Sequence, residues 1–159
     1  MKTSFEIREN EFWWGGSVSD GIEMPFSRET TGFSRDFRVE TSNQTMPLYV
    51  SSQGRYIWSE TPFAVTIDGG RFTFEGDEFE LVEAGSTLRD AYLAASKAHF
   101  PFSGKLPPVE FFSTAQYNTW MEFTYEPNQA GVLQYAHAIV DNGFTPGIFI
   151  IDEGWHRPY

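Results

Sequence analysis

The sequence predicts a mainly β fold with an α/β tail, in which an antiparallel β-sandwich precedes a helix and a βαβ unit. Short stretches that alternate polar and apolar residues recur from Phe5 to about Val82. Helical periodicity replaces this alternation after Gly85. An unbroken apolar run over residues 147–151 then indicates a buried parallel strand. Aromatic residues make up 18% of the chain, which supplies enough apolar surface for a packed core.

Alternation and turn residues define the strands of the sandwich. Residues 35–40, 71–75 and 78–81 each alternate polar and apolar side chains, so one face of each strand can be buried. Asp68-Gly69, between the apolar stretches 63–67 and 72–74, is the clearest hairpin signal. Many short strands at this spacing are typical of a sandwich.

A helix is expected to begin at Thr87, which can cap it together with Asp90 three residues later. Its apolar side is formed by Leu88, Ala91, Tyr92, Ala95 and Ala98, and the helix ends near His99. Pro101, Gly104, Pro107 and Pro108 then form a rigid connector. We therefore divide the chain into a β-sandwich (1–85), a helix with a Pro-rich linker (86–108) and a third segment (109–159).

The third segment has the pattern of strand, helix and strand. Residues 109–114 predict a buried strand, and Pro127-Asn128 begins a helix that Gly143 ends. The apolar side of this helix carries Val132, Tyr135, Ala136, Ile139 and Val140. Residues 147–151 form the second strand, so the segment predicts one βαβ unit with parallel strands.

Polar and aromatic residues gather at the carboxyl ends of these strands, where parallel sheets place their functional sites. The first end carries Gln116, Tyr117, Asn118, Thr119 and Trp120, and the second carries Asp152, Glu153, Trp155, His156 and Arg157. A carboxylate beside an indole suits a sugar, because the acid accepts hydrogen bonds from hydroxyls and the ring stacks on the carbon face. The alternative is that Asp152 only caps the turn after its strand.

Charge and composition exclude several classes of function. The net charge of −11 repels phosphate backbones, so we expect no nucleic-acid partner. The absence of cysteine excludes disulfides, thiolate catalysis and Cys-based zinc sites. Three scattered His residues lack metal-ligand spacing, so we expect no metal and no cofactor.

The sequence also bears on membranes and compartment. No stretch is long and apolar enough to span a bilayer, so we expect no membrane partner. Charged residues from Glu6 to Glu11 stand where a signal peptide would need an apolar stretch. This favours the cytoplasm and leaves periplasmic or secreted locations open if a signal has been removed.

Several segments resemble family 31 glycoside hydrolases in the order that the family has them. Residues 112–120 (FSTAQYNTW), the helix at Tyr135-Ala136, Asn142-Gly143 and residues 150–155 (IIDEGW) resemble the opening of the catalytic barrel. Residues 50–60 resemble part of the family's N-terminal sandwich, and residues 85–101 resemble the link between the sandwich and the barrel. The resemblance implies a galactose-mutarotase-like sandwich followed by the first βαβ unit of a (β/α)8 barrel.

The resemblance also implies a function and its site. The family cleaves α-glycosidic bonds with retention, through a nucleophile and an acid/base carboxylate. Both carboxylates come from later barrel strands, so we expect no catalytic residue here. Asp152 matches a carboxylate that binds sugar hydroxyls in the −1 subsite, and Trp120 falls near a position that walls this subsite. Trp155 and Asn118 complete the candidate substrate-binding residues.

A barrel needs about 250 residues, so the 159 residues are expected to be an inactive fragment of a longer enzyme. Its expected partners are an α-linked oligosaccharide or glycoside and the remainder of its own barrel. The alternative function is a non-catalytic carbohydrate-binding or scaffolding sandwich, with sugar bound by an exposed Trp13, Trp14 or Trp58. A protein-interaction domain is a third possibility, favoured only by the strand edges that an incomplete barrel exposes.

Overall fold

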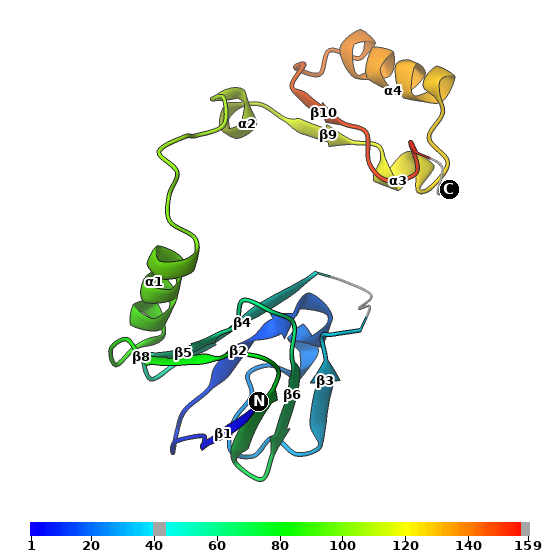
Figure 1. Ribbon diagram of the computed structural model, residues 1–159. Coiled ribbons are helices and arrows are strands. Elements are labelled where there is room, and N and C mark those ends of the chain that lie inside the picture. Colours follow the sequence, from blue (N-terminus) through cyan, green and yellow to red (C-terminus); the bar gives the residue numbers. More distant parts are fainter. Residues whose placement is uncertain (40–43, 157–159) are drawn as a thin grey trace. The chain divides into compact units, whose positions relative to one another are not determined.

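The computed structural model describes residues 1–39 and 44–156 and divides the chain into two units, Met1–Phe102 and Ser103–Tyr159 (Figure 1). The N-terminal unit contains β1 (Lys2–Glu6), β2 (Trp13–Ser17), the 3-10 helix η1 (Val18–Glu23), β3 (Phe33–Asp36), β4 (Thr45–Ser51), β5 (Arg55–Trp58), β6 (Ala64–Asp68), β7 (Arg71–Glu75), β8 (Glu80–Glu83) and helix α1 (Leu88–His99).

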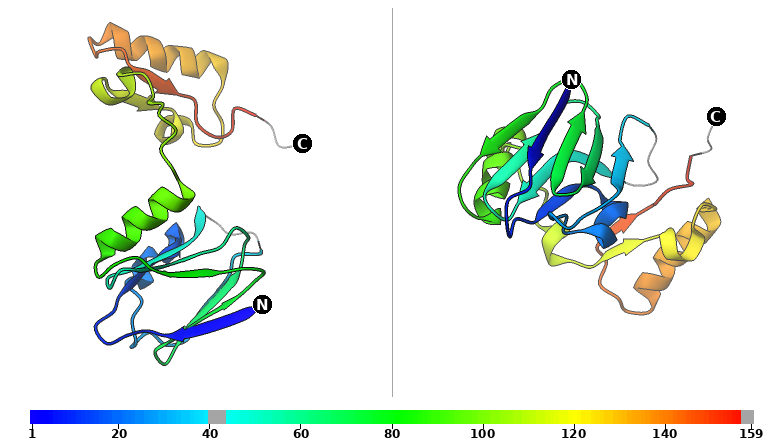
Figure 2. Two further views of the ribbon diagram at one scale, coloured as in Figure 1. Left: turned by 60° about the vertical axis from the view of Figure 1, so that its left-hand side comes forward. Right: turned by 90° about the horizontal axis from the view of Figure 1, so that it is seen from below.

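These strands form two antiparallel four-stranded sheets, with the orders β1-β7-β6-β3 and β2-β4-β5-β8 (Figures 1 and 2). An aromatic core joins side chains from both sheets. Its buried members are Ile7, Trp13, Phe26, Phe33, Phe37, Tyr49, Ile57, Phe63, Val65, Ile67, Phe72 and Phe74. The predicted mainly β sandwich is therefore confirmed, and the abundant aromatic residues supply its core.

Strand β5 is buried on both faces because α1 covers the sheet that contains it. Ile57 points into the core between the sheets, whereas Tyr56 and Trp58 pack with Ala91 and Ala95 of α1. These two alanines form the buried part of the helix; Tyr92 and Ala98, expected on the apolar side, are exposed. The buried stripe is narrower than expected because the large Tyr56 and Trp58 side chains leave room only for small residues opposite.

Two local sequence signals are confirmed in the N-terminal unit. The β6–β7 hairpin turns at Gly69 and Gly70, whose φ angles of 54° and 79° place both in the left-handed region that glycine tolerates best. Helix α1 begins with the expected capping box, in which Thr87 and Asp90 each accept a hydrogen bond from the other's backbone N–H.

Two strand boundaries differ from the sequence prediction. Strand β3 ends at Asp36, because the Asp36 carboxylate accepts a hydrogen bond from the Arg38 backbone N–H at 3.0 Å and turns the chain. Residues 37–39 of the predicted strand 35–40 are therefore not part of the strand, and Glu40 lies outside the described residues. Strand β8 begins at Glu80 rather than residue 78, and it pairs Leu81 with Ile57 of β5.

The C-terminal unit contains α2 (Glu110–Ser113), β9 (Gln116–Asn118), α3 (Trp120–Phe123), α4 (Gln129–Asp141) and β10 (Ile148–Ile150). Strands β9 and β10 are parallel neighbours on either side of α4, so a βαβ unit is present as predicted, but its first strand is Gln116–Asn118. The strand predicted at residues 109–114 is wrong, since this stretch forms α2 with the Thr114 N–H bonded to the Glu110 carbonyl. A short apolar run does not distinguish a strand from a helical turn by periodicity.

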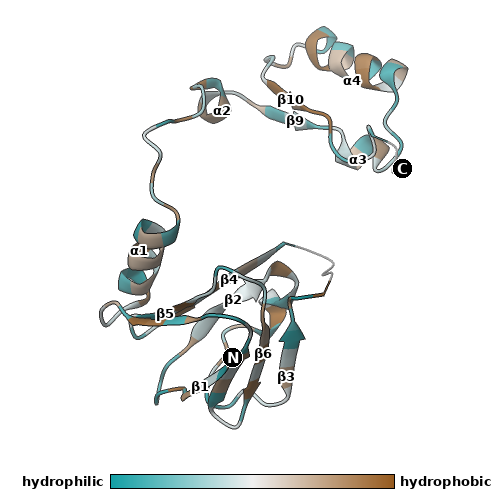
Figure 3. Ribbon diagram, viewed as in Figure 1, coloured by the Kyte–Doolittle hydropathy of each residue, from teal (hydrophilic) through white to brown (hydrophobic). Residues whose placement is uncertain are grey.

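Helix α4 follows the prediction at both ends. The Asn128 side chain caps it by accepting a hydrogen bond from the Gly131 N–H at 2.9 Å, and Gly143 with a φ of 77° follows its end. The helix carries hydrophobic and hydrophilic bands (Figure 3), with Ile139 buried but Val140 exposed. The expected burial of β10 on both faces is wrong for this unit, because Ile150 is 38% exposed.

A buried ion pair between Glu11 and Arg55 lies at the core of the sandwich. The Glu11 side chain is fully buried and that of Arg55 is 5% exposed. The Arg55 guanidinium donates to both Glu11 carboxylate oxygens and lies 5.2 Å from the centre of the Trp13 ring. Glu11 also accepts hydrogen bonds from the Ser51 hydroxyl and the Arg8 backbone N–H. Every partner that the buried carboxylate needs is therefore supplied.

Replacing Arg55 with Met is expected to destabilise the N-terminal unit by about 3–5 kcal/mol, because Glu11 is left buried without its counter-ion. The matched control is Arg71→Met, which breaks an ion pair with Glu6 in which both side chains are more than half exposed. That change should lower the free energy of unfolding by about 1 kcal/mol or less. Urea unfolding of both variants measures the difference, and equal losses would contradict the importance of the buried pair.

The same site should make stability depend on pH. Burial raises the pKa of Glu11, but hydrogen bonds from Arg55, Ser51 and the Arg8 N–H outweigh burial and lower this pKa below its ordinary value of 4.5. The carboxylate's contribution is therefore complete above pH 4.5 and is lost as the pH falls through the lowered folded-state pKa. Glu11→Gln should flatten the acid limb of the curve of unfolding free energy against pH. Parallel curves for the two proteins would refute the assignment.

Candidate functional site

Hydrogen bonds connect the carboxyl ends of β9 and β10 past the last paired residues of the two strands. Asn118 pairs with Ile150 as the last register position of the parallel ladder. The Thr119 backbone N–H then donates to the Ile150 carbonyl at 3.1 Å, and the Asp152 N–H donates to the Thr119 hydroxyl at 2.9 Å. The Thr119 side chain, 1% exposed, therefore acts as the acceptor that continues the pairing as far as Asp152.

The Asp152 carboxylate is held through both of its oxygens. Oδ1 accepts a hydrogen bond from the Glu153 backbone N–H at 2.7 Å, and Oδ2 accepts one from the Asn118 Nδ2 at 2.7 Å. These two bonds, the backbone one first, lower the pKa of Asp152 against the opposing effect of partial burial. The turn-capping bond that the sequence offered as an alternative is thus present, and Asn118 adds a second bond across the two strands.

The structure brings three of the four candidate residues together. Asn118 bonds to Asp152 through its amino group and accepts a hydrogen bond from the Trp120 backbone N–H at 2.6 Å. The Trp120 ring packs edge to face against Tyr125, with the ring centres 4.9 Å apart. Trp155, the fourth residue, is 69% exposed, and its ring lies against His156. Arg157, named with this strand end, lies outside the described residues.

The loop that carries Asp152 and Trp155 packs against Tyr125 through Gly154. A Cβ at Gly154 would lie 2.4 Å from the Tyr125 carbonyl oxygen, and the Gly154 φ angle of 91° also disfavours other residues. This glycine therefore allows residues 152–156 to lie directly on the turn after α3. Sequence reasoning placed Gly154 in the family-like segment without giving it this role.

The turn after α3 contains a backbone conformation that is unusual for threonine. Thr124 has φ 48° and ψ −114°, and the Glu126 N–H donates to the Phe123 carbonyl at 2.9 Å. These values define a type II′ turn with Thr124 at the position that glycine normally occupies. Strained residues of this kind concentrate at functional sites. Nothing in the sequence signalled this turn, because threonine there contradicts its usual residue preference.

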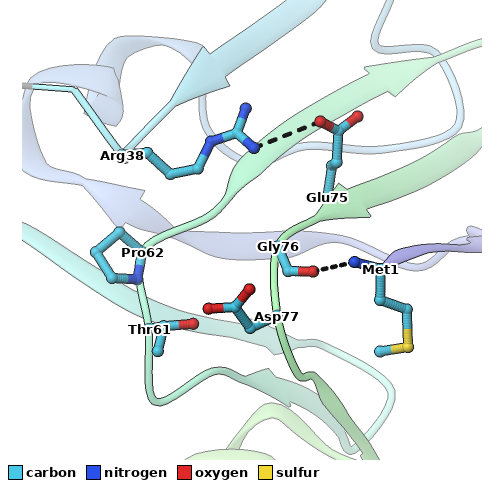
Figure 4. Close-up of a pocket in the computed structure, with 7 residues that line it drawn as sticks. All are labelled: Met1, Arg38, Thr61, Pro62, Glu75, Gly76 and Asp77. Carbon is cyan, nitrogen blue, oxygen red and sulfur yellow. Dashed lines mark hydrogen bonds and ion pairs between the residues drawn. The ribbon is translucent and has the colours of Figure 1, made fainter.

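The sandwich offers weaker candidates. Trp13 and Trp58 are buried, so they cannot form an exposed sugar platform, and Trp14 is half-buried. The cavity in Figure 4 has a volume of about 490 Å³ and is lined by Met1, Arg38, Thr61, Pro62, Glu75, Gly76 and Asp77. Its arginine is engaged by Glu75 at 3.4 Å and by Asp36. We therefore place the candidate site at Asp152.

Within residues 1–39 and 44–156, no group of three or more His, Asp or Glu side chains could hold a metal ion. None of the helices described in these ranges has both the length and the apolar character needed to cross a membrane.

Comparison of the sequence with protein-family models finds no match, and comparison with curated proteins finds none. The fold, in contrast, matches solved structures of a GH31 dextranase from Flavobacterium johnsoniae. The structure of a variant complexed with isomaltotriose aligns with a TM-score of 0.58 and 12% identity, over 98% of this chain and 20% of that chain. The glucose complex aligns with a TM-score of 0.59 and 13% identity over the same shares.

The comparison defines the class of fold to which this chain belongs. The β-sandwich has the fold of part of a GH31 glycoside hydrolase. The chain spans about a fifth of the length of those enzymes. At this level of identity, the likeness concerns the fold alone.

The strain at Thr124 can be measured by comparing two substitutions. Thr124→Gly and Thr124→Ala both remove the hydroxyl, but only alanine keeps a Cβ at a φ of 48°. At ordinary positions glycine is less stable than alanine, whereas here we expect Thr124→Gly to be more stable by about 1 kcal/mol. Urea unfolding followed through the NMR amide signals of α4 gives the two values. An alanine variant of equal or greater stability would show that the turn is unstrained.

Proposed function

We propose that this chain is part of a retaining α-glycosidase of family 31, in which Asp152 binds sugar hydroxyls in the −1 subsite. The observation that carries the proposal is the ionised Asp152 carboxylate, held at the carboxyl edge of a parallel strand pair beside Trp120. The fold shared with a GH31 dextranase supports a substrate-binding role for this edge of the strand pair. The nucleophile and the acid/base belong to barrel strands outside these 159 residues.

The chemistry of the site suits a neutral polyhydroxyl ligand. An ionised carboxylate has about four accepting positions, and hydrogen bonds from Glu153 and Asn118 occupy one on each oxygen. Each oxygen therefore keeps a position for a hydroxyl donor. The exposed Trp155 ring provides a face for sugar carbons, and the second amino hydrogen of Asn118 remains for a further contact. An anionic ligand is disfavoured by the net charge of −11.

We further propose that the chain has three segments. Residues 1–85 are the sandwich, residues 86–108 the helix and linker, and residues 109–159 the first βαβ unit of the barrel. Several large apolar side chains of the C-terminal unit, Phe112, Met121, Ile150 and Ile151 among them, are exposed. The remainder of the barrel is the partner that would cover such surface. Sugar binding by the sandwich alone is disfavoured, because Trp13 and Trp58 are buried.

Sugar titration followed by NMR tests the proposal on this chain. Millimolar isomaltose or methyl α-glucoside should shift amide signals at residues 118–120 and 152–155, and Asp152→Asn should weaken that binding at least about tenfold. The matched control, Asp141→Asn at the exposed end of α4, should bind as the unmodified chain does. The same samples should release no phenol from aryl α-glycosides.

Three results would contradict the proposal. Sugar-induced shifts confined to the sandwich would favour the carbohydrate-binding module. Equal binding by the Asp152→Asn and Asp141→Asn variants would remove Asp152 from the site. Hydrolysis that survives purification and disappears on Asp152→Asn would place catalysis within this chain.

A further inference from the structure

We propose that Asn118 and Thr119 are positioning residues that hold Asp152 in one orientation. Only the consequence of this role for sugar binding rests on the proposed function. Thr119 fixes the backbone of Asp152, and Asn118 fixes its carboxylate. Sequence reasoning treated Asn118 as a direct substrate contact and gave Thr119 no role. The hydrogen bonds assign both residues to the support of their neighbour on β10.

The case for Thr119 rests on burial and on the direction of its hydrogen bonds. Its backbone N–H is used by the Ile150 carbonyl, and its hydroxyl accepts from the Asp152 N–H. With an exposure of 1%, this hydroxyl cannot reach a ligand in solution. The Thr119 hydroxyl therefore acts by fixing the position of the Asp152 backbone relative to β9.

The two ends of the Asn118 amide have different hydrogen-bond partners, and these partners set its orientation. The Trp120 N–H is a donor, so the atom that faces it at 2.6 Å must be the Asn118 Oδ1. The amino group is then directed to the Asp152 Oδ2 at 2.7 Å, and a flipped amide would break both bonds. The start of α3 thus fixes which end of Asn118 faces the carboxylate. A neutral donor placed this way favours the ionised form of Asp152.

Substitution by aspartate tests the orientation of the Asn118 amino group, because it replaces the donor that faces Asp152 with a negatively charged oxygen. Asn118→Asp has nearly the same shape and keeps the acceptor for the Trp120 N–H, but it replaces the donor to Asp152 with a carboxylate oxygen. The titration midpoint of Asp152, read from its carboxyl carbon by NMR in the full chain, should then rise. A side chain at position 118 that did not face the Asp152 carboxylate would leave this midpoint unchanged. An unmoved midpoint would overturn the role of Asn118.

The matched control is Asn128→Asp, which adds the same charge to the same unit. Aspartate caps a helix about as well as asparagine, so the bond from the Gly131 N–H to residue 128 is kept. This variant should leave the Asp152 midpoint where it is in the unmodified chain. A rise as large as that of Asn118→Asp would show that added charge alone moves the midpoint, and it would overturn the proposal.

Thr119 is tested through the exchange of the Asp152 amide hydrogen. Thr119→Val keeps the buried shape but lacks the acceptor, and it should speed exchange of this hydrogen about tenfold. Thr119→Ser keeps the hydroxyl and should restore slow exchange. Fast exchange in the serine variant, or slow exchange in a folded valine variant, would overturn the role of Thr119.

The tests are independent of the proposed function, because neither the midpoint nor the exchange rate requires a sugar. If both change as expected and no sugar binds, the positioning role stands and the subsite assignment fails. If sugar binds through Asp152 while both measurements stay unmoved, the subsite assignment stands and the positioning role fails.

Discussion

The sandwich depends on the buried ion pair between Glu11 and Arg55. Arg55 lies on β5, the strand that is buried on both faces, and its other neighbours along that strand pack against either the core or α1. A shift of β5 by one residue would exchange its two faces and would also separate the guanidinium from Glu11. Because an unpaired buried charge is far more costly than a misplaced apolar side chain, the pair selects one register more sharply than hydrophobic packing does.

In the C-terminal unit, neutral side chains hold the strand ends in position. Its two strands are short, and the parallel ladder between β9 and β10 covers three residue pairs. The polar groups of Asn118 and Thr119 extend the connection to Asp152, where the backbone pairing has ended. Gly154 and the type II′ turn at Thr124 then let the following loop lie on Tyr125. A carboxylate at a strand end is in this way held by hydrogen bonds to both of its oxygens.

Sequence reasoning predicted the features that depend on local chemistry. The Gly69-Gly70 turn, the capping box at Thr87 and the Asn128 cap each follow from residues within a few positions of one another. It failed where tertiary context decides: residues 109–114 form a helical turn, and the buried stripe of α1 is narrower than its periodicity suggests. The Glu11–Arg55 pair and the role of Thr119 were not predicted, because charged and hydroxyl side chains are usually exposed and only the fold brings their distant partners together.

The distribution of these interactions has a consequence for the site. Among the described residues, the hydrogen-bond partners of Asp152 all lie between Asn118 and Glu153, on the two strand ends of one βαβ unit. The orientation and charge of the carboxylate therefore require only this unit to be folded. In the proposed barrel, further strands of the same parallel sheet would meet an acceptor that is already ionised and oriented. Preorganisation of this kind lowers the cost of ordering a polar group when a ligand binds. This arrangement is the one that the proposed role of Asp152 requires, with substrate bound here and the reacting groups supplied by other strands.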